Sequence, residues 1–109
     1  MHSLNQQKHT MRSVTQLSEA AIQRQVMKAL EKEGWTCVKL IQTNLNGMPD
    51  LLCLRAGMTM FIEVKSETGR PSALQLHRIE KLKMNGFGAY VVSSVKQLYL
   101  MGLIRELCN

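Results

Sequence analysis

The spacing of hydrophobic residues near the start of the chain predicts an amphipathic helix. After Ser18, a candidate N-cap, the residues Ile22, Val26 and Leu30 follow at intervals of four and would share one helical face. Gly34 then ends the pattern. We therefore expect a helix with its apolar side packed against the protein.

Two later segments show a similar period and predict two more helices. One runs from Ser72, a candidate cap, to Asn85, with Gly86 just beyond its end. The other begins after Ser94 and continues toward the C-terminus. Its apolar positions are Leu98, Met101, Leu103 or Ile104, and Leu107, and the inward face of the first carries Gln75, Ile79 and Leu82.

Runs of β-branched and apolar residues between these helices predict four strands. They cover residues 35–43, 50–55, 59–66 and 88–93. Ala56-Gly57 is a tight link that makes the second and third strands a hairpin. The order is α-β-β-β-α-β-α, which predicts an α/β fold with a mixed sheet flanked by helices.

The length of 109 residues allows one domain. We assign residues 16–109 to it and interpret residues 1–15, which are polar and aperiodic, as a flexible arm. No apolar leader or membrane-length apolar run is present, so we expect a cytoplasmic protein with no membrane contact.

Charge changes this picture by indicating a polyanionic partner. Lys and Arg number 14 against 8 acids, which gives a net charge of +6 and a pI near 9.6. Seven of the acids are Glu, and Asp50, directly after a proline, is the sole aspartate. That residue is a candidate for a specific role.

Cysteine and histidine positions argue against a zinc site. Cys37, Cys53 and Cys108 form no CxxC pair, and the first two fall in apolar runs typical of small buried residues. His77 stands alone in a predicted helix. No serine or cysteine has a partnered base in a recognisable nucleophile motif.

The third predicted strand places a carboxylate and an ammonium on one face. Side chains alternate along a strand, so Glu63 and Lys65 are neighbours there, and Asp50 begins the adjacent strand. Converging carboxylates suit Mg²⁺, and a nearby lysine can orient a water for phosphodiester hydrolysis. Taken alone, the triplet Glu63-Val64-Lys65 is better explained as a surface ion pair on a half-exposed strand.

The conjunction of several motifs carries a family resemblance. Gly47-Met48-Pro49-Asp50 is followed 13 positions later by Glu63-Val64-Lys65, then by Gly69-Arg70 and by Gln75 at a helix start. In this the chain resembles the PD-(D/E)XK nuclease superfamily and, within it, a minimal standalone form of the virus-type replication-repair nuclease (VRR-NUC) domain. The superfamily's core matches the predicted order of elements.

The resemblance implies a role for each residue of the central motif. Asp50 and Glu63 would be metal ligands, with the carbonyl of Val64 as a further donor. Lys65 would be the catalytic lysine that positions water and would also contact DNA.

It also implies supporting residues on either side of that motif. Glu19 would act on the metal directly or through water, although an acid in the first turn of a helix also simply complements the helix dipole. Gln75 would be the polar catalytic residue that opens the next helix. Arg70 and Ser72, in the loop after the strand, would lie near substrate phosphates.

The activity implied is Mg²⁺-dependent, structure-selective cleavage of branched DNA such as Holliday junctions, with Mn²⁺ as a substitute metal. Members of this kind work as homodimers, in bacterial or phage-infected cells. Apolar residues in the last predicted helix, Leu100, Met101 and Leu103, are candidates for the dimer surface.

Two other functions stay open at this point. One is a non-catalytic nucleic-acid-binding module, in which the acids are structural. The other is a restriction-type nuclease that cuts one sequence in linear duplex and ignores junctions.

Overall fold

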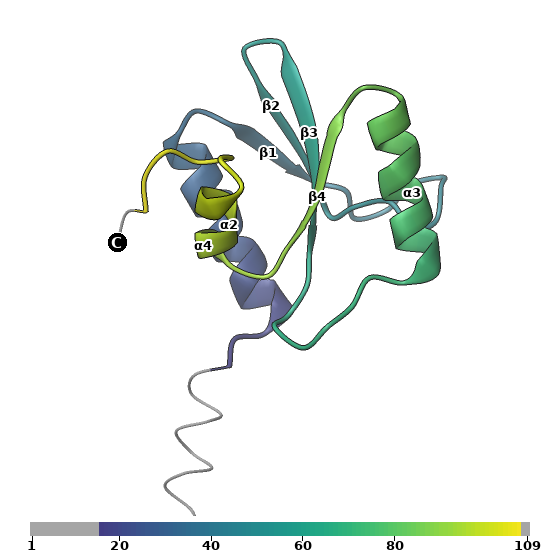
Figure 1. Ribbon diagram of the computed structural model, residues 1–109, viewed down its shortest axis with the longest axis horizontal. Coiled ribbons are helices and arrows are strands. Elements are labelled where there is room, and N and C mark those ends of the chain that lie inside the picture. The colour runs from purple at the N-terminus through teal and green to yellow at the C-terminus, as the bar shows by residue number, and fades with distance from the viewer. Residues whose placement is uncertain (1–15, 108–109) are drawn as a thin grey trace, which may run out of the picture.

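Helix α2 (Glu19–Lys32) forms where the spacing of apolar residues predicted it. The computed structural model describes residues 16–107 (Figure 1). Ser18 caps the helix by accepting the N–H of Ala21, and Ile22, Val26 and Leu30 are buried, as predicted. The predicted arm, residues 1–15, and Cys108 lie outside the described residues.

The four strands form one mixed sheet in the order β1-β2-β3-β4. Strands β1 (Thr36–Lys39), β2 (Leu51–Arg55) and β3 (Met58–Val64) pair antiparallel, whereas β4 (Gly88–Val92) runs parallel to β3. Parallel pairing requires a crossover, which α3 (Ala73–Met84) provides. The α/β class and the order of elements are confirmed.

Helices cover both faces of this sheet. Figure 1 shows α2 and α4 (Val95–Leu100) on one side and α3 on the other. The core lies mainly between α2, α4 and the sheet, because α2 packs on α4, β1 and β3. Its largest fully buried apolar side chains are Leu30, Leu51, Ile62 and Leu98.

Two predicted elements extend too far. The first strand ends at Lys39 rather than at residue 43: Leu40 still donates its N–H to the Asp50 carbonyl, but Ile41 is 87% exposed and adds little to the core. The last helix ends at Leu100 because Gly102 takes a positive φ of 77°, although the chain returns to bury Ile104.

The two described cysteines are part of the core, as expected. Cys53 is fully buried and Cys37 partly so, and they lie opposite one another in β2 and β1. The thiol hydrogen bond to Cys37 and burial both raise the pKa of Cys53. They act as apolar filling between α2 and the sheet.

In residues 16–107, no helix has the length and apolar character needed to cross a membrane.

Replacing Leu30 with Ala tests this description of the core. Leu30 is fully buried on the inward face of α2, so we expect Leu30→Ala to lower the free energy of unfolding by about 2–5 kcal/mol in urea denaturation. Ile41→Ala, at an exposed position, should change it by no more than about 0.5 kcal/mol. Equal losses for the two variants would contradict the assigned packing.

Candidate active site

Glu63 and Lys65 share the face of β3 that is turned toward α3, as the alternation predicted. Lys65 Nζ lies 3.1 Å from Glu63 Oε2. The side chain of Glu63 is only 1% exposed and that of Lys65 16%, so this is not the exposed surface pair that the triplet alone allowed. A carboxylate is thus held inside the fold at the end of β3.

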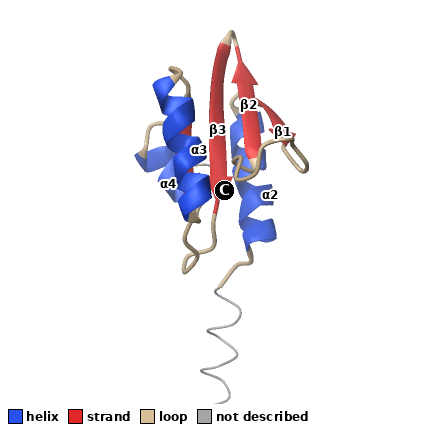
Figure 2. Ribbon diagram, turned by 90° about the vertical axis from the view of Figure 1, so that its right-hand side faces the viewer, coloured by secondary structure: helices blue, strands red, loops and turns tan. Residues whose placement is uncertain are grey.

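Asp50 joins this pair through the backbone of β3. Its Oδ2 accepts the N–H of Val64 at 2.8 Å, directly between Glu63 and Lys65. The structure therefore brings Asp50, Glu63 and Lys65 together. Their meeting place is the end of the sheet opposite the β2–β3 turn, where β3 runs into the loop to α3 (Figure 2).

Pro49 explains why the carbonyl of Val64 is available to a ligand. The last pair of the β2–β3 ladder is Leu51 with Ile62, and the same register continued would place Pro49 opposite Val64. Proline has no N–H, so it cannot donate to that carbonyl. The side chain of Asp50 takes up the N–H of Val64 instead, and the ladder ends at this point.

Helix α3 fixes the turn that precedes Asp50. Gly47 has a φ of 82°, and a Cβ there would lie 2.7 Å from Cγ of Leu74 on α3. Arg78 Nε donates to the carbonyl of Asn46 at 2.7 Å. Leu74 and Arg78 are positioning residues that the sequence analysis missed, because no local pattern reveals a contact between α3 and this turn.

Gln75 connects the start of α3 to the buried carboxylate. Its Nε2 donates to Glu63 Oε2 at 2.9 Å, and its Oε1 accepts the N–H of Ser72 at 2.9 Å. Ser72 Oγ in turn accepts the N–H of Gln75, which completes a capping box. The hydroxyl of Ser72, predicted to lie near DNA, is thus engaged as the helix cap.

Burial dominates the acid–base properties of the two carboxylates. Desolvation raises the pKa of Asp50 and of Glu63, against the lowering effect of the Val64 N–H on Asp50 and of Lys65 on Glu63. For Lys65, desolvation opposes the charged form, but the hydrogen bond to Glu63 and the nearby carboxylates raise its pKa. The ammonium therefore stays protonated, whereas the carboxylates carry their charge at a cost.

Glu19 lies in the first turn of α2 and is exposed. Its charge contributes to raising the pKa of both Asp50 and Glu63, so it faces the same end of the sheet. Among residues 16–107, however, no group of three His, Cys, Asp or Glu side chains lies close enough to hold a metal ion. The carboxylates of Asp50 and Glu63 therefore form the centre of this cluster, and Glu19 acts on them only through its charge.

The chemistry of these donors fits a divalent cation. Glu63 Oε1 is buried and has no hydrogen-bond partner, which is costly for an oxygen that carries charge. Mg²⁺ takes one or two carboxylates and completes its octahedron with water, carbonyl and phosphate oxygens. Asp50, Glu63 and the Val64 carbonyl supply such a set.

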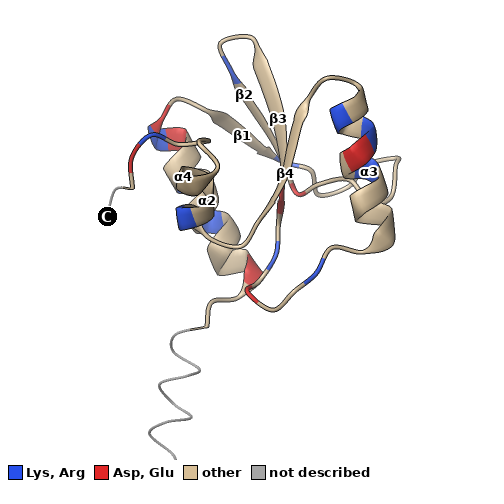
Figure 3. Ribbon diagram, viewed as in Figure 1, with Lys and Arg blue, Asp and Glu red and all other residues tan. Residues whose placement is uncertain are grey.

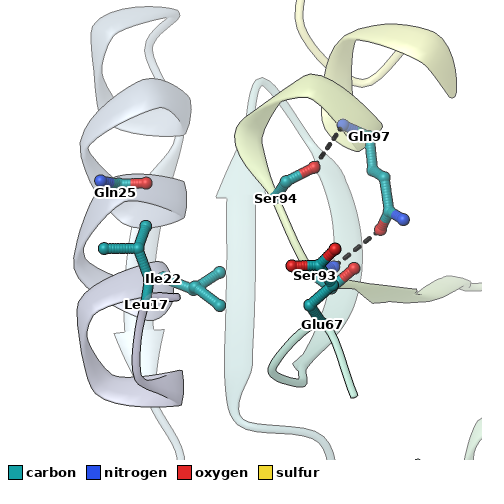
Figure 4. A pocket seen from close by; sticks show the side chains of 7 residues that line it. All are labelled: Leu17, Ile22, Gln25, Glu67, Ser93, Ser94 and Gln97. Carbon is teal, nitrogen blue, oxygen red and sulfur yellow. Dashed lines mark hydrogen bonds between the residues drawn. The ribbon is translucent and has the colours of Figure 1, made fainter. Parts of the chain in front are cut away.

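Two features border this centre. Arg70 is exposed in the loop between β3 and α3, free to reach a substrate. On the other side, a hollow of about 360 Å³ lies between α2 and the start of α4 (Figure 4). Its lining includes Glu67, Ser93 and Gln97, with no lysine or arginine. It is therefore an unfavourable place for a phosphate.

Thermal unfolding tests the cation site without reference to activity. Because the pKa values of Asp50 and Glu63 are raised in the fold, the metal-free protein should gain stability as pH falls through those values. Mg²⁺ at ten times its dissociation constant should add about 1.4 kcal/mol at pH 8, or roughly 5–10 °C in Tm. This gain should shrink as the pH is lowered, because protons compete with Mg²⁺ for the same carboxylates.

Glu63→Gln should abolish the Mg²⁺-dependent rise in Tm and, in EDTA at pH 8, be at least as stable as the wild type. Glu80→Gln, on the exposed side of α3, is the matched control and should keep the rise. A rise of equal size in Glu63→Gln would show that the cation binds elsewhere.

Comparison with known proteins agrees with the fold. A search of curated proteins found no match. A solved structure described as a VRR_NUC domain is similar, with a TM-score of 0.71 and 29% identity, covering 83% of this chain and 100% of that one. The sequence profile of the VRR-NUC domain matches residues 2–96. The chain belongs to the VRR-NUC domain family, a family of nuclease-type domains.

Proposed function

We propose that this protein is a Mg²⁺-dependent endonuclease that hydrolyses phosphodiester bonds in branched DNA and works as a homodimer. One observation carries the catalytic part: Glu63 is buried with an unpartnered oxygen, beside Asp50 and Lys65. A structural carboxylate would have both oxygens satisfied. This one is held ready for a ligand.

Each residue at this centre has a distinct role in the proposed reaction. Gln75 and Lys65 both contact Oε2 of Glu63, which leaves Oε1 without a hydrogen bond, and we assign Oε1 to the metal. Asp50 is fixed by the Val64 N–H. Lys65, protonated and partly exposed, can orient a water for attack and stabilise the charge that develops on the phosphate.

A bound Mg²⁺ would supply Lewis-acid polarisation of the phosphate and would lower the pKa of a coordinated water. The residues that would hold it are Asp50, Glu63 and the carbonyl of Val64, with Glu19 acting through water. Mn²⁺, which accepts similar oxygen ligands, should substitute.

Net charge and exposed cations support DNA as the substrate. The net charge of +6 favours a polyanion, and Arg70 is exposed in the loop that begins where β3 ends. We assign Arg70 and Lys65 to contacts with phosphates. Ser72 belongs to the same set: its Oγ accepts the N–H of Gln75 in the helix cap, and its O–H can still donate to a phosphate.

Exposed apolar residues at the C-terminal end of α4 support the dimer. Leu100 is 68% exposed and Met101 47%. Leu103, the third residue predicted for this surface, packs partly against the core instead. We therefore place the dimer contact on Leu100 and Met101. A dimer would supply the two active sites needed to cut both strands at a junction.

Substitution of the central residues tests the catalytic assignment. Asp50→Asn, Glu63→Gln and Lys65→Met should each lower the cleavage rate of a labelled four-way junction by at least about 100-fold in Mg²⁺. Arg78 is not a suitable position for a control substitution, because its side chain donates to the turn before Asp50. Lys96→Met, at an exposed position on α4, should cut at the wild-type rate.

The same assay should include flap and linear duplex, each with Mg²⁺, Mn²⁺ or EDTA. Cutting of the junction but not the duplex is expected. Sequence-specific cutting of duplex would favour a restriction-type nuclease, and binding without cleavage of any substrate would favour a non-catalytic module. Wild-type rates in all three variants would refute the site.

Light scattering tests the dimer. The wild type should show twice the chain mass of 12.4 kDa, and the double variant Leu100→Glu/Met101→Glu should be a folded monomer. Charges placed in an apolar contact cost several kcal/mol of association, whereas at free surface positions they are tolerated. Leu76→Glu, exposed on α3, is the control and should stay dimeric. A monomeric wild type would rule the dimer out.

A further inference from the structure

A basic groove lies between α2 and the edge strand β1. Arg24 and Lys28 from α2 and Lys39 from β1 line it, and its volume is about 530 Å³. Glu31 is the one acid in the lining, so the side chains of the groove carry a net charge of +2. This groove was not apparent from sequence, because Lys39 and the two α2 residues meet only in the fold.

The groove begins at the catalytic end of the sheet. Lys39 is paired with Leu51, the neighbour of Asp50, and Leu40 donates its N–H to the carbonyl of Asp50. On the α2 side the lining begins at Ala21, two residues after Glu19. From there it follows the helix toward Lys28. In Figure 3 the acidic first turn of α2 lies at one end of the helix, with basic positions farther along it.

The three cations are available for an external partner. Within the part of the chain that the structure describes, the ion pairs are Lys65 with Glu63, Lys83 with Glu80 and Arg105 with Glu33. None of them engages the groove. Arg24, Lys28 and Lys39 are all exposed. Long cationic side chains outside these ion pairs, lined along one groove, suit a row of phosphates.

The hollow on the other side of α2 makes the contrast clear. Gln25 lines both, so the helix separates them. One contains Glu67 and no cation, and the other contains three cations and one acid. A nucleic-acid strand that leaves the catalytic centre along α2 would therefore follow the β1 side.

We propose that the groove between α2 and β1 binds the sugar–phosphate backbone of the nucleic-acid strand that flanks the scissile phosphate. This inference rests on the proposed nuclease function and specifies where its substrate runs. Arg70 contacts phosphates from the opposite side of the centre, so the strand crosses Glu63 and Lys65 between two basic flanks. Contacts to the backbone alone carry no base preference, which fits recognition of DNA shape.

Salt-dependent binding tests the groove. A triple variant, Arg24→Ala/Lys28→Ala/Lys39→Ala, would be compared with Lys81→Ala/Lys83→Ala/Lys96→Ala, which removes the same charge from exposed positions on α3 and α4. Both are built on the Glu63→Gln background, so that the four-way junction stays intact. Binding is measured by fluorescence anisotropy from 50 to 300 mM KCl.

The groove variant should lower the slope of log K against log[KCl] by roughly 2–3, because each phosphate that the protein no longer neutralises reduces it by about 0.9. Binding at 100 mM KCl should weaken at least about tenfold. The control variant Lys81→Ala/Lys83→Ala/Lys96→Ala should change the salt slope and the affinity far less. In the Glu63-containing chain, the groove variant should keep the Mg²⁺-dependent rise in Tm, which shows that the centre itself is intact.

Equal slopes and affinities for the two triple variants would overturn the inference while leaving the nuclease proposal standing. Loss of the Mg²⁺-dependent rise in Tm in the groove variant would also overturn it, because the cations would then be supporting the fold. Displacement of the junction by a poly-glutamate peptide as readily as by unlabelled DNA would assign the groove to acidic proteins. A wild type that binds no nucleic acid would refute both proposals.

Discussion

The burial of Glu63 is the constraint on which the arrangement of this end of the molecule depends. A carboxylate that is 1% exposed requires partners, since an isolated charge in the interior costs several kcal/mol. Lys65 directly follows the same strand, but Gln75 comes from α3, so the first turn of that helix must pack against the end of β3. The capping box formed with Ser72 fixes where that turn begins. Both partners use one oxygen of Glu63 and leave the other without a hydrogen bond.

The dipeptide Pro49-Asp50 resolves a second constraint in the same place. Antiparallel pairing of β2 with β3 has to stop where the ligands are needed, and a proline stops it because it has no N–H to donate. The side chain of Asp50 then accepts the N–H of Val64 that the ladder would otherwise have used. Two adjacent residues thus act together: Pro49 ends the hairpin pairing, and Asp50 brings a second carboxylate beside Glu63. Gly47 allows α3 to pack closely on the turn that leads into this dipeptide.

Features that depend on residues close together in sequence could be predicted, whereas contacts between distant segments could not. The period of Ile22, Val26 and Leu30 and the alternation along β3 are local, and both predicted the observed elements and the shared face of Glu63 and Lys65. The end of β1 depends on where the chain leaves the sheet, and the end of α4 depends on the positive φ at Gly102. Neither can be predicted from a run of apolar residues. The bridge from Gln75 to Glu63, and the contacts of Leu74 and Arg78 with the turn, join elements distant in sequence. The resemblance indicated Gln75 as a site residue, but only the packing shows that it positions Glu63.

Electrostatics connects the catalytic centre to the surface around it. The chain carries a net charge of +6, yet Glu19, Asp50 and Glu63 face one lysine at the end of the sheet, which leaves a local charge of −2. In the proposed function, a phosphate backbone would be attracted to the protein as a whole and repelled at the point where it would be cut. Basic groups on either side, Arg70 in the loop and the groove along α2, can hold the strand against that repulsion. Close approach of the scissile phosphate still requires that the carboxylates be neutralised. In the proposed function, a divalent cation would do this without the protonation that would remove the ligands, so cation binding and productive substrate binding would depend on each other.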